Sequence, residues 1–237
     1  MKTILEILKK GTLKIEGQLI VGTNYTFLTS VDFDHNHIQA VYKPEKGEIP
    51  LWDFPAHTLA NRETAAYIIS EALNWNFVPP TIIRSDAPLG RGSLQFFIPH
   101  DPRLNYFTFS DDIKHSLKKV VAFDLVVNNA DRKGSHIILD QKGQIKLIDH
   151  GICFHQDPKY RTVIWDFIGE SIPTLLIKDI ARLGRLVKTE SPEIKDLDDL
   201  LSKKEISALV ARINQILKDP FFPGPNKNYR PFPYPLV

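Results

Sequence analysis

Two acidic residues in the second half of the chain, Asp131 and Asp149, each come after a short apolar run and before an expected turn. Asp131 lies in the polar segment 128–136, and Asp149 is followed by His150 and Gly151. Two carboxylates at the ends of separate apolar elements can act in the same functional site only if the fold brings them close together. This pattern favours folds that close a cleft around residues distant in sequence.

The composition allows one large domain or two closely packed lobes. The chain has 237 residues, 43% of them hydrophobic, so it can bury a substantial core. Thirty basic residues stand against twenty-eight acidic ones without a long basic run, so neither nucleic acid nor an anionic membrane is expected as an obligate partner. Cys153 is the single cysteine, which excludes an intramolecular disulfide and predicts a buried apolar role in a cytoplasmic protein.

No targeting or membrane-spanning segment is expected. Residues 1–10 have the pattern of a short amphipathic helix interrupted by Glu6, and they lack the small-residue cleavage site of a signal peptide. No apolar run approaches the roughly 18 residues needed to span a bilayer. The pattern therefore predicts a soluble protein.

The order of the expected elements predicts an α+β fold with two lobes. The first half has strands within 12–43, a helix at about 59–73 and a strand at 93–98. The second half has a helix capped by Ser110 or Asp111 that continues to Asp124, a hairpin at 136–148, and helices at 173–187 and 203–218. The predicted parts are a β-rich N-terminal lobe (1–98), a mainly helical C-terminal lobe (99–219) and a proline-rich tail (220–237) that is extended or draped on the surface.

A lysine and a glutamate in the N-terminal half form a candidate pair. Lys43 ends a predicted strand, from which its ammonium group can reach phosphates across a cleft, although alone it also fits a surface lysine. Glu63 follows twenty residues later on the next helix, where its carboxylate orients Lys43 or simply favours the helix N-terminus. Together they indicate phosphate binding more specifically than either does alone.

Asp131, His136 and Asp149 supply the remaining groups that phosphoryl transfer needs. Such a site requires cations for the phosphates, acidic residues for a metal, and a group that positions the acceptor hydroxyl. Asp131 is the candidate for the last role, with a plain turn residue as the alternative. Protein kinases place a metal-binding asparagine five residues after the catalytic aspartate, and here the fifth residue is His136.

Two further features bear on this site. Asp124 lies on the apolar face of its helix, so it is expected to have a hydrogen-bonded partner and to brace the loop of Asp131, unless the helix has already ended there. The stretch from Gly17 to Thr26 either turns so that its backbone N–H groups cover phosphates or forms a plain hairpin. No Walker A motif occurs.

On these residues the chain resembles the atypical kinases of the phosphatidylinositol 3- and 4-kinase superfamily, which is related to the HipA-type serine kinases. It is most similar to a small bacterial group described as phosphatidylinositol 3- and 4-kinase-like. The motifs that carry the resemblance are Asn24–Leu28, Val41–Pro44, Asn61–Tyr67, Gln95–Ile98, Phe123–Asp124, Asn128–Arg132 and Ile148–Gly151.

The resemblance implies a bilobal kinase fold that binds ATP with Mg²⁺ and transfers the γ-phosphoryl group to a hydroxyl acceptor. It implies that Lys43 contacts the phosphates and pairs with Glu63, and that Asp131 and Arg132 are catalytic. The other implied roles are nucleotide contacts for Asn24 and Thr26, an adenine-side hinge of Gln95, Phe96, Phe97 and Ile98, metal ligation by Asp149 and His136, bracing by Asp124 and His150, and acceptor contacts from Arg161, Trp165 and Asp166.

Two histidines depart from the superfamily pattern. His136 stands in place of the usual asparagine, and His150 in place of the aromatic residue after the metal aspartate. Because imidazole favours softer ions than Mg²⁺, we hypothesise that the second metal is weakly held or that Mn²⁺ is preferred. The acceptor (protein, small molecule or lipid) is not indicated.

Other functions fit parts of the pattern. The two histidines also suit a nucleotide-binding pseudokinase that acts as an interaction module. A metal-dependent phosphohydrolase would use His136, Asp149, His150 and His155 as ligands, but it leaves Lys43 unexplained. The same fold could also transfer AMP instead of phosphate.

Overall fold

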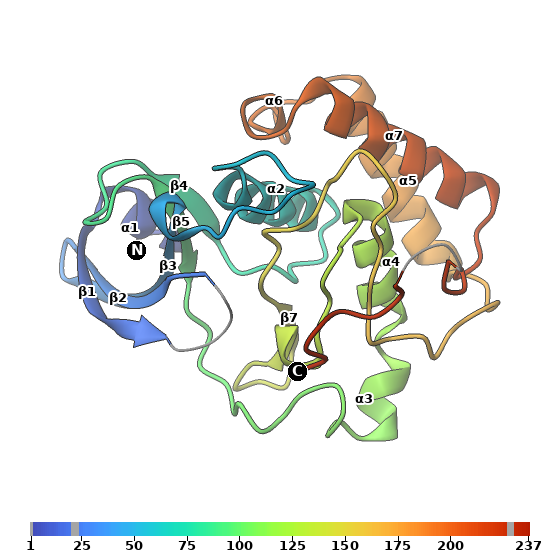
Figure 1. Cartoon of the computed structure of the whole chain (residues 1–237), viewed down its shortest axis with the longest axis horizontal. Coiled ribbons are helices and arrows are strands. Elements are labelled where there is room, and N and C mark those ends of the chain that lie inside the picture. The colour runs from blue at the N-terminus through green and yellow to red at the C-terminus, as the bar shows by residue number, and fades with distance from the viewer. Residues whose placement is uncertain (1, 20–23, 227–229) are drawn as a thin grey trace.

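The chain folds into two lobes, as Figure 1 shows. The computed structural model describes residues 2–19, 24–226 and 230–237. A five-stranded antiparallel sheet makes up most of the smaller lobe, and helices make up most of the larger one. This arrangement confirms the predicted α+β plan.

The sheet has the strand order β1–β2–β3–β5–β4, and all its neighbours are antiparallel. Asp34 and His35 form a two-residue turn between β2 and β3, and both adopt the positive φ that tight hairpins require. Strand β3 therefore begins directly after the turn, at Asn36. The strands are β1 (Thr12–Leu19), β2 (Thr26–Phe33), β3 (Asn36–Pro44), β4 (Thr81–Arg84) and β5 (Gly92–Phe96).

Strand β4 lies outside the predicted elements. It follows Pro79 and Pro80, contains four residues, and pairs with β5 at one edge of the sheet. So short a strand shows too few alternations of apolar and polar side chains to be recognised from the sequence.

The smaller lobe has its own core beneath helix α1 (Ile4–Lys10). Ile7 and Leu8 of α1 pack against Val31, Tyr42 and other buried residues of the sheet. Thr3 caps the helix by accepting a hydrogen bond from the backbone N–H of Glu6, as N-cap threonines do. The predicted N-terminal helix is thus present and covers one face of the sheet.

Helix α2 (Leu59–Ala72) connects the two lobes. It contacts β4 and β5 of the sheet as well as α4 and α6 of the larger lobe. Its buried residues Ala65, Ala66 and Ile69 belong to the core of the larger lobe. Helix α2 therefore belongs to the sequence before residue 98 but contributes to the core of the larger lobe, and the boundary at residue 98 stays a prediction.

The larger lobe contains five helices and one hairpin among the described residues. The single helix expected from residue 110 is wrong, because it divides into α3 and α4 at Ser116, whose hydroxyl donates to the carbonyl O of Ile113 (2.6 Å) and competes with the helical pattern. The elements are α3 (Asp111–His115), α4 (Lys118–Val127), β6 (Ile137–Leu139), β7 (Ile145–Leu147), α5 (Thr174–Lys188), α6 (Leu197–Leu200) and α7 (Lys203–Lys218).

The proline-rich tail crosses the surface of the larger lobe. Its last described part, segment 230–237, ends near the β6–β7 hairpin (Figure 1). In the parts of the chain that the structure describes, no helix is both long and apolar enough to cross a membrane.

Candidate active site

Lys43 lies at the centre of an ion-pair network between the lobes. Its Nζ is 2.5 Å from Oε1 of Glu63 on α2 and 2.9 Å from Oδ1 of Asp149 after β7. Burial disfavours a charged ammonium group, but the two carboxylates outweigh this effect and raise the pKa of Lys43 above its usual value. The lysine is therefore a fixed cation at neutral pH, and the predicted pairing with Glu63 is present.

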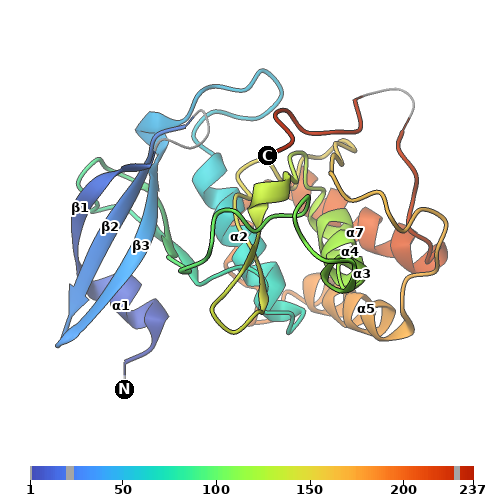
Figure 2. The ribbon, with the colours of Figure 1, turned by 90° about the horizontal axis from the view of Figure 1, so that it is seen from below.

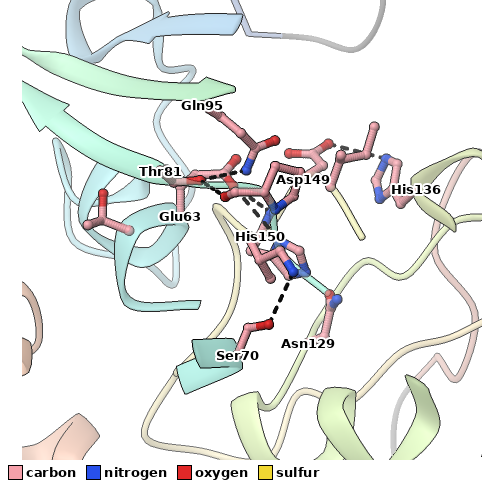
Figure 3. A network of polar contacts seen from close by, with 12 residues as sticks. Glu63, Ser70, Thr81, Gln95, Asn129, His136, Asp149 and His150 are labelled. Atoms are coloured by element: carbon pink, nitrogen blue, oxygen red, sulfur yellow. Dashed lines mark hydrogen bonds and ion pairs between the residues drawn. The ribbon is translucent and has the colours of Figure 1, made fainter. Parts of the chain in front are cut away.

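Asp149 occupies a strained turn directly after β7 and Ile148. Its φ of 62° lies in the left-handed region, which aspartate tolerates better than most residues. Oδ2 is 3.2 Å from Nε2 of His136, and Figure 3 shows Asp149 between this histidine and Glu63. Burial raises the pKa of Asp149, but Lys43 and His136 oppose it strongly and lower the pKa below its usual value.

Glu63 holds the turn as well as the lysine. Its Oε2 accepts a hydrogen bond from the backbone N–H of His150 at 2.9 Å, while Oε1 binds Lys43. The ring of His150 is fully buried, and burial together with nearby Arg132 lowers its pKa well below 6.5. His150 is thus a neutral internal residue whose backbone N–H is held by Glu63, and its supporting role stays a prediction.

Asp131 lies in the loop that follows α4. Asn128 ends the helix with a left-handed conformation (φ 53°), and Asn129 Oδ1 accepts from the backbone N–H of Asp131 at 2.9 Å. Burial raises the pKa of Asp131 to about 6; Lys133 opposes this rise and the charge of Asp149 adds to it. A carboxylate with this pKa can exchange a proton near neutral pH.

The structure changes the interpretation of Arg132. Its guanidinium group is fully buried and donates to both carboxylate oxygens of Asp124 at 2.8 Å, and to the carbonyl O of His136 at 3.1 Å. Asp124 also accepts from Asn129 Nδ2 at 3.1 Å, so it has the partners predicted for a bracing residue. Arg132 therefore positions the loop of Asp131 and cannot reach a substrate, contrary to the catalytic role expected for it.

Lys133 is a site residue that the sequence reasoning missed. Its Nζ is 3.3 Å from Oδ2 of Asp131, and its side chain is largely buried. The signal was available, because the lysine lies only two residues after Asp131 in the same polar loop. It adds a second cation to the site beside Lys43.

Of the three acceptor candidates, Arg161 lies nearest to Asp131. Its backbone pairs with the loop of Asp131, through Arg161 N to Asn129 O (3.0 Å) and Arg132 N to Arg161 O (3.1 Å), and its charge acts to lower the pKa of Asp131. Trp165 instead stacks edge to face on Tyr160. Asp166 accepts a hydrogen bond from the hydroxyl of Tyr106 at 2.6 Å.

The nucleotide-side candidates are divided between two places. Gln95 donates from its side chain to the hydroxyl of Thr81 at 2.8 Å (Figure 3), and the backbone N–H groups of Phe96 and Phe97 bind Pro80 O and Gln39 O. For Ile98, the last of the four expected hinge residues, contact with an adenine ring stays a prediction, as it does for the other three.

Thr26 begins β2, and Asn24 precedes it, at the end of the sheet nearer the loop after β3. Asn24 Oδ1 accepts from the backbone N–H of Ile49 at 2.8 Å, so it fixes that loop. Residues 20–23 of the predicted phosphate-covering turn lie outside the described residues.

The phosphohydrolase alternative finds no support in the geometry. Among the described residues, no group of three or more histidine, cysteine, aspartate or glutamate side chains could hold a metal ion. The Nε2 atom of His150 is 3.0 Å from the guanidinium group of Arg132, and Nε2 of His155 donates to the carbonyl O of Asp53 at 2.8 Å. The four expected ligands therefore do not form one site.

A nucleotide-bound cation fits Asp149 better than it fits His136. The side chain of Asp149 is 46% exposed, and its two carboxylate oxygens, which contact Lys43 and His136, are the kind of ligand that Mg²⁺ prefers. The buried Nδ1 of His136 has no hydrogen-bond partner, whereas a metal-binding histidine nearly always donates its other N–H to an acceptor. Asp149 is thus the main metal-ligand candidate, and ligation by His136 stays a prediction.

These features define a class of protein: a two-lobed kinase-like fold in which a strand lysine, a helix glutamate and two loop aspartates lie close together between the lobes. The structure is similar to the Helicobacter pylori proinflammatory kinase CtkA, with a TM-score of 0.56 and 12% identity over 91% of this chain and 94% of that chain. At this identity the similarity establishes the fold alone.

The family follows from sequence comparison. The description "Phosphatidylinositol 3- and 4-kinase" matches residues 56–202, which is more than half of the chain. The chain is also 36% identical to Protein Rv2133c of Mycobacterium tuberculosis over 97% of its own length and 94% of that protein. The chain therefore belongs to the phosphatidylinositol 3- and 4-kinase family, and kinase-type phosphoryl transfer is supported; the expected relation to HipA-type kinases stays a prediction.

Proposed function

We propose that the protein is an ATP- and divalent-metal-dependent kinase that transfers the γ-phosphoryl group to a hydroxyl acceptor. The observation that carries this proposal is the Lys43 network, in which one ammonium group binds both Glu63 and Asp149. A lysine held by a helix glutamate next to a metal-binding aspartate is the arrangement that kinases use on nucleotide phosphates. The buried single cysteine agrees with a cytoplasmic location.

Each residue of the network has a separate role. Lys43 would bind nucleotide phosphate oxygens, and Glu63 would keep its ammonium group aimed at them. Asp149 would hold a divalent cation; the metal and ATP supply charge neutralisation and the phosphoryl group when bound. Mn²⁺ is our proposed alternative to Mg²⁺ because His136 lies beside Asp149.

Asp131 would position the acceptor hydroxyl and receive its proton. The raised pKa, about 6, leaves the carboxylate deprotonated at neutral pH and still able to take up a proton during transfer. Lys133, 3.3 Å from Asp131, places a cation where charge on the transferred group would develop. Arg132 contributes only by fixing the loop through Asp124.

Two measurements test the proposal. We expect a non-hydrolysable ATP analogue to bind with Mg²⁺ or Mn²⁺ in calorimetry, and Asp149→Asn to weaken this binding at least about tenfold. We expect Asp131→Ala to bind the analogue normally and to lose transfer of labelled phosphate. Binding without transfer in the unchanged protein would favour the pseudokinase alternative, and mass spectrometry of a labelled acceptor would distinguish added phosphate from added AMP.

A further inference from the structure

Segment 230–237 lies across the loop that carries Asp131. The backbone N–H of Gly134 donates to Leu236 O at 2.8 Å, and that of Thr162 donates to Pro231 O at 3.2 Å. Gly134 is three residues after Asp131, and Thr162 directly follows Arg161. Both views of the ribbon place this segment beside the catalytic loop (Figures 1 and 2). It therefore lies on the acceptor side of the proposed active site.

We call the surface that carries these two backbone donors, and on which segment 230–237 lies, the groove. Arg132 and Thr162 form a parallel bridge, in which Arg132 N binds Arg161 O and Val163 N binds Arg132 O, both at 3.1 Å. This pairing fixes the spacing between the N–H groups of Gly134 and Thr162. Since both residues are buried, their N–H groups need acceptors. In the structure, backbone carbonyl groups of segment 230–237 accept these two hydrogen bonds.

Phe107 forms a wall of this groove next to Gly134. A Cβ atom added at Gly134 would lie 2.8 Å from the ring of Phe107 and 3.6 Å from Leu236 O. Only glycine allows the loop to approach the ring so closely, which keeps the N–H of Gly134 available to a chain lying in the groove.

Segment 230–237 is held lightly. Pro233 is its buried residue, whereas a tail packed permanently would also bury its large apolar side chains. These are instead substantially exposed: Phe232 43%, Tyr234 78%, Leu236 43% and Val237 57%. The segment therefore occupies the groove with few contacts and can be displaced.

We propose that this groove is the docking site for a polypeptide acceptor and that segment 230–237 is its internal competitor. The inference rests on the proposed kinase function and names its substrate class. In the reaction, the hydroxyl oxygen of a docked serine or threonine bonds to the γ-phosphorus while the bond to the ADP oxygen breaks, and the hydroxyl proton goes to Asp131. Segment 230–237 contains no serine or threonine, so it fills the groove without supplying that acceptor.

Segment 230–237 competes with a polypeptide acceptor more strongly than a free peptide would, because it is covalently attached to the same chain. A tethered segment has an effective concentration of about 1 mM, so a segment of intrinsic Kd about 100 μM would weaken an acceptor's binding roughly tenfold. Removing the segment should therefore strengthen acceptor binding by about that factor without changing nucleotide affinity.

The first experiment measures binding with a fluorescent peptide that has the sequence of residues 230–237. We expect it to bind the chain lacking 230–237 about tenfold more tightly than the full chain. In the full-length protein, Pro233→Asp should have the same effect because it displaces the buried proline, and Tyr234→Asp, at the exposed neighbour, is the matched control. Equal peptide binding by all variants, or equal effects of the two substitutions, would overturn the proposal.

The second experiment measures transfer of labelled phosphate from ATP to a mixture of serine- and threonine-containing peptides. The chain lacking residues 230–237 and the Pro233→Asp variant should both transfer phosphate several-fold faster than the unchanged protein when the peptide concentration is below saturation. A gain with phosphatidylinositol vesicles or glycerol but none with peptides would overturn the assignment of the acceptor. Absence of ATP-analogue binding would refute the kinase function itself, while the peptide-binding experiment would still decide whether the groove takes a polypeptide.

Discussion

At the scale of single residues, Asp131 illustrates how a functional carboxylate lowers stability. Its side chain is only 20% exposed and lies near Asp149, so the pKa rises from 3.8 to about 6 on folding. The folded state therefore holds the proton more tightly than the unfolded state does. Stability contributed by this proton is present at low pH and decreases as the pH rises from about 4 to 6.

We predict that Asp131→Asn stabilises the protein at pH 7.5 by about 1–3 kcal/mol, since two pKa units correspond to roughly 2.7 kcal/mol. The gain should shrink as the pH falls towards 4, where the aspartate is itself protonated. Thermal denaturation at several pH values measures this, with the exposed Asp199→Asn as the control. An equal gain in stability at pH 7.5 and at about pH 4 would show that the raised pKa of Asp131 is not its cause.

Arg132 and Asp124 give a second prediction at this scale. Both side chains are fully buried, so Arg132→Met leaves an unpaired carboxylate and should cost about 3–5 kcal/mol. Removing both charges, in Asp124→Leu with Arg132→Met, should recover most of this stability but not phosphoryl transfer, because the loop of Asp131 loses its anchor. Urea denaturation tests the first part, and a double variant no more stable than Arg132→Met would refute it.

At the scale of elements, helix α2 determines how the site is assembled. It carries Glu63, which reaches Lys43 on β3 and the backbone of His150 after β7. The sequence predicted this helix within one residue because its apolar positions recur at helical spacing. It did not predict β4 or the break between α3 and α4, since both depend on local hydrogen bonds that leave little periodic pattern.

Glu63→Gln separates the two functions of this helix. The amide oxygen can still accept from His150 N, but the charge that holds Lys43 is lost. We expect at least about tenfold weaker binding of a Mg²⁺–ATP analogue. Because the Glu63 side chain is only 4% exposed, we also expect a loss of thermal stability, limited by Asp149, which still pairs with Lys43. Glu71→Gln, on the exposed side of the same helix, is the matched control and should change neither measurement.

At the scale of the whole molecule, the sequence predicted the two-lobed plan and the set Lys43, Glu63, Asp131 and Asp149. The order of strands and helices specifies such a plan. The sequence could not specify which side chains are buried. No feature of the neighbouring sequence distinguishes Arg132, which forms a buried ion pair with Asp124, from Lys133, which pairs with Asp131. The position of segment 230–237 was equally inaccessible, because its contacts to Gly134 and Thr162 involve backbone atoms alone.

The lobes are also fastened by the loop between β3 and α2, and this connection gives the last prediction. Asp53 in this loop binds Lys159 Nζ at 2.9 Å through its side chain and His155 Nε2 at 2.8 Å through its carbonyl O, and both partners belong to the larger lobe. The two side chains of the Asp53–Lys159 pair are mostly buried, so Asp53→Asn leaves Lys159 without its charge partner. We expect the loop to open more often, so that limited proteolysis within residues 48–58 becomes several-fold faster while the core resists cleavage.

The matched control is Asp86→Asn. It removes a pair with Arg84 in which the aspartate is 76% exposed, and it should leave the cleavage rate unchanged. Equal cleavage rates in all three proteins would show that the Asp53–Lys159 pair does not hold the loop. A second measurement adds an ATP analogue. If the analogue protects the unchanged protein from cleavage and Asp53→Asn removes that protection, the loop couples closure of the lobes to nucleotide binding.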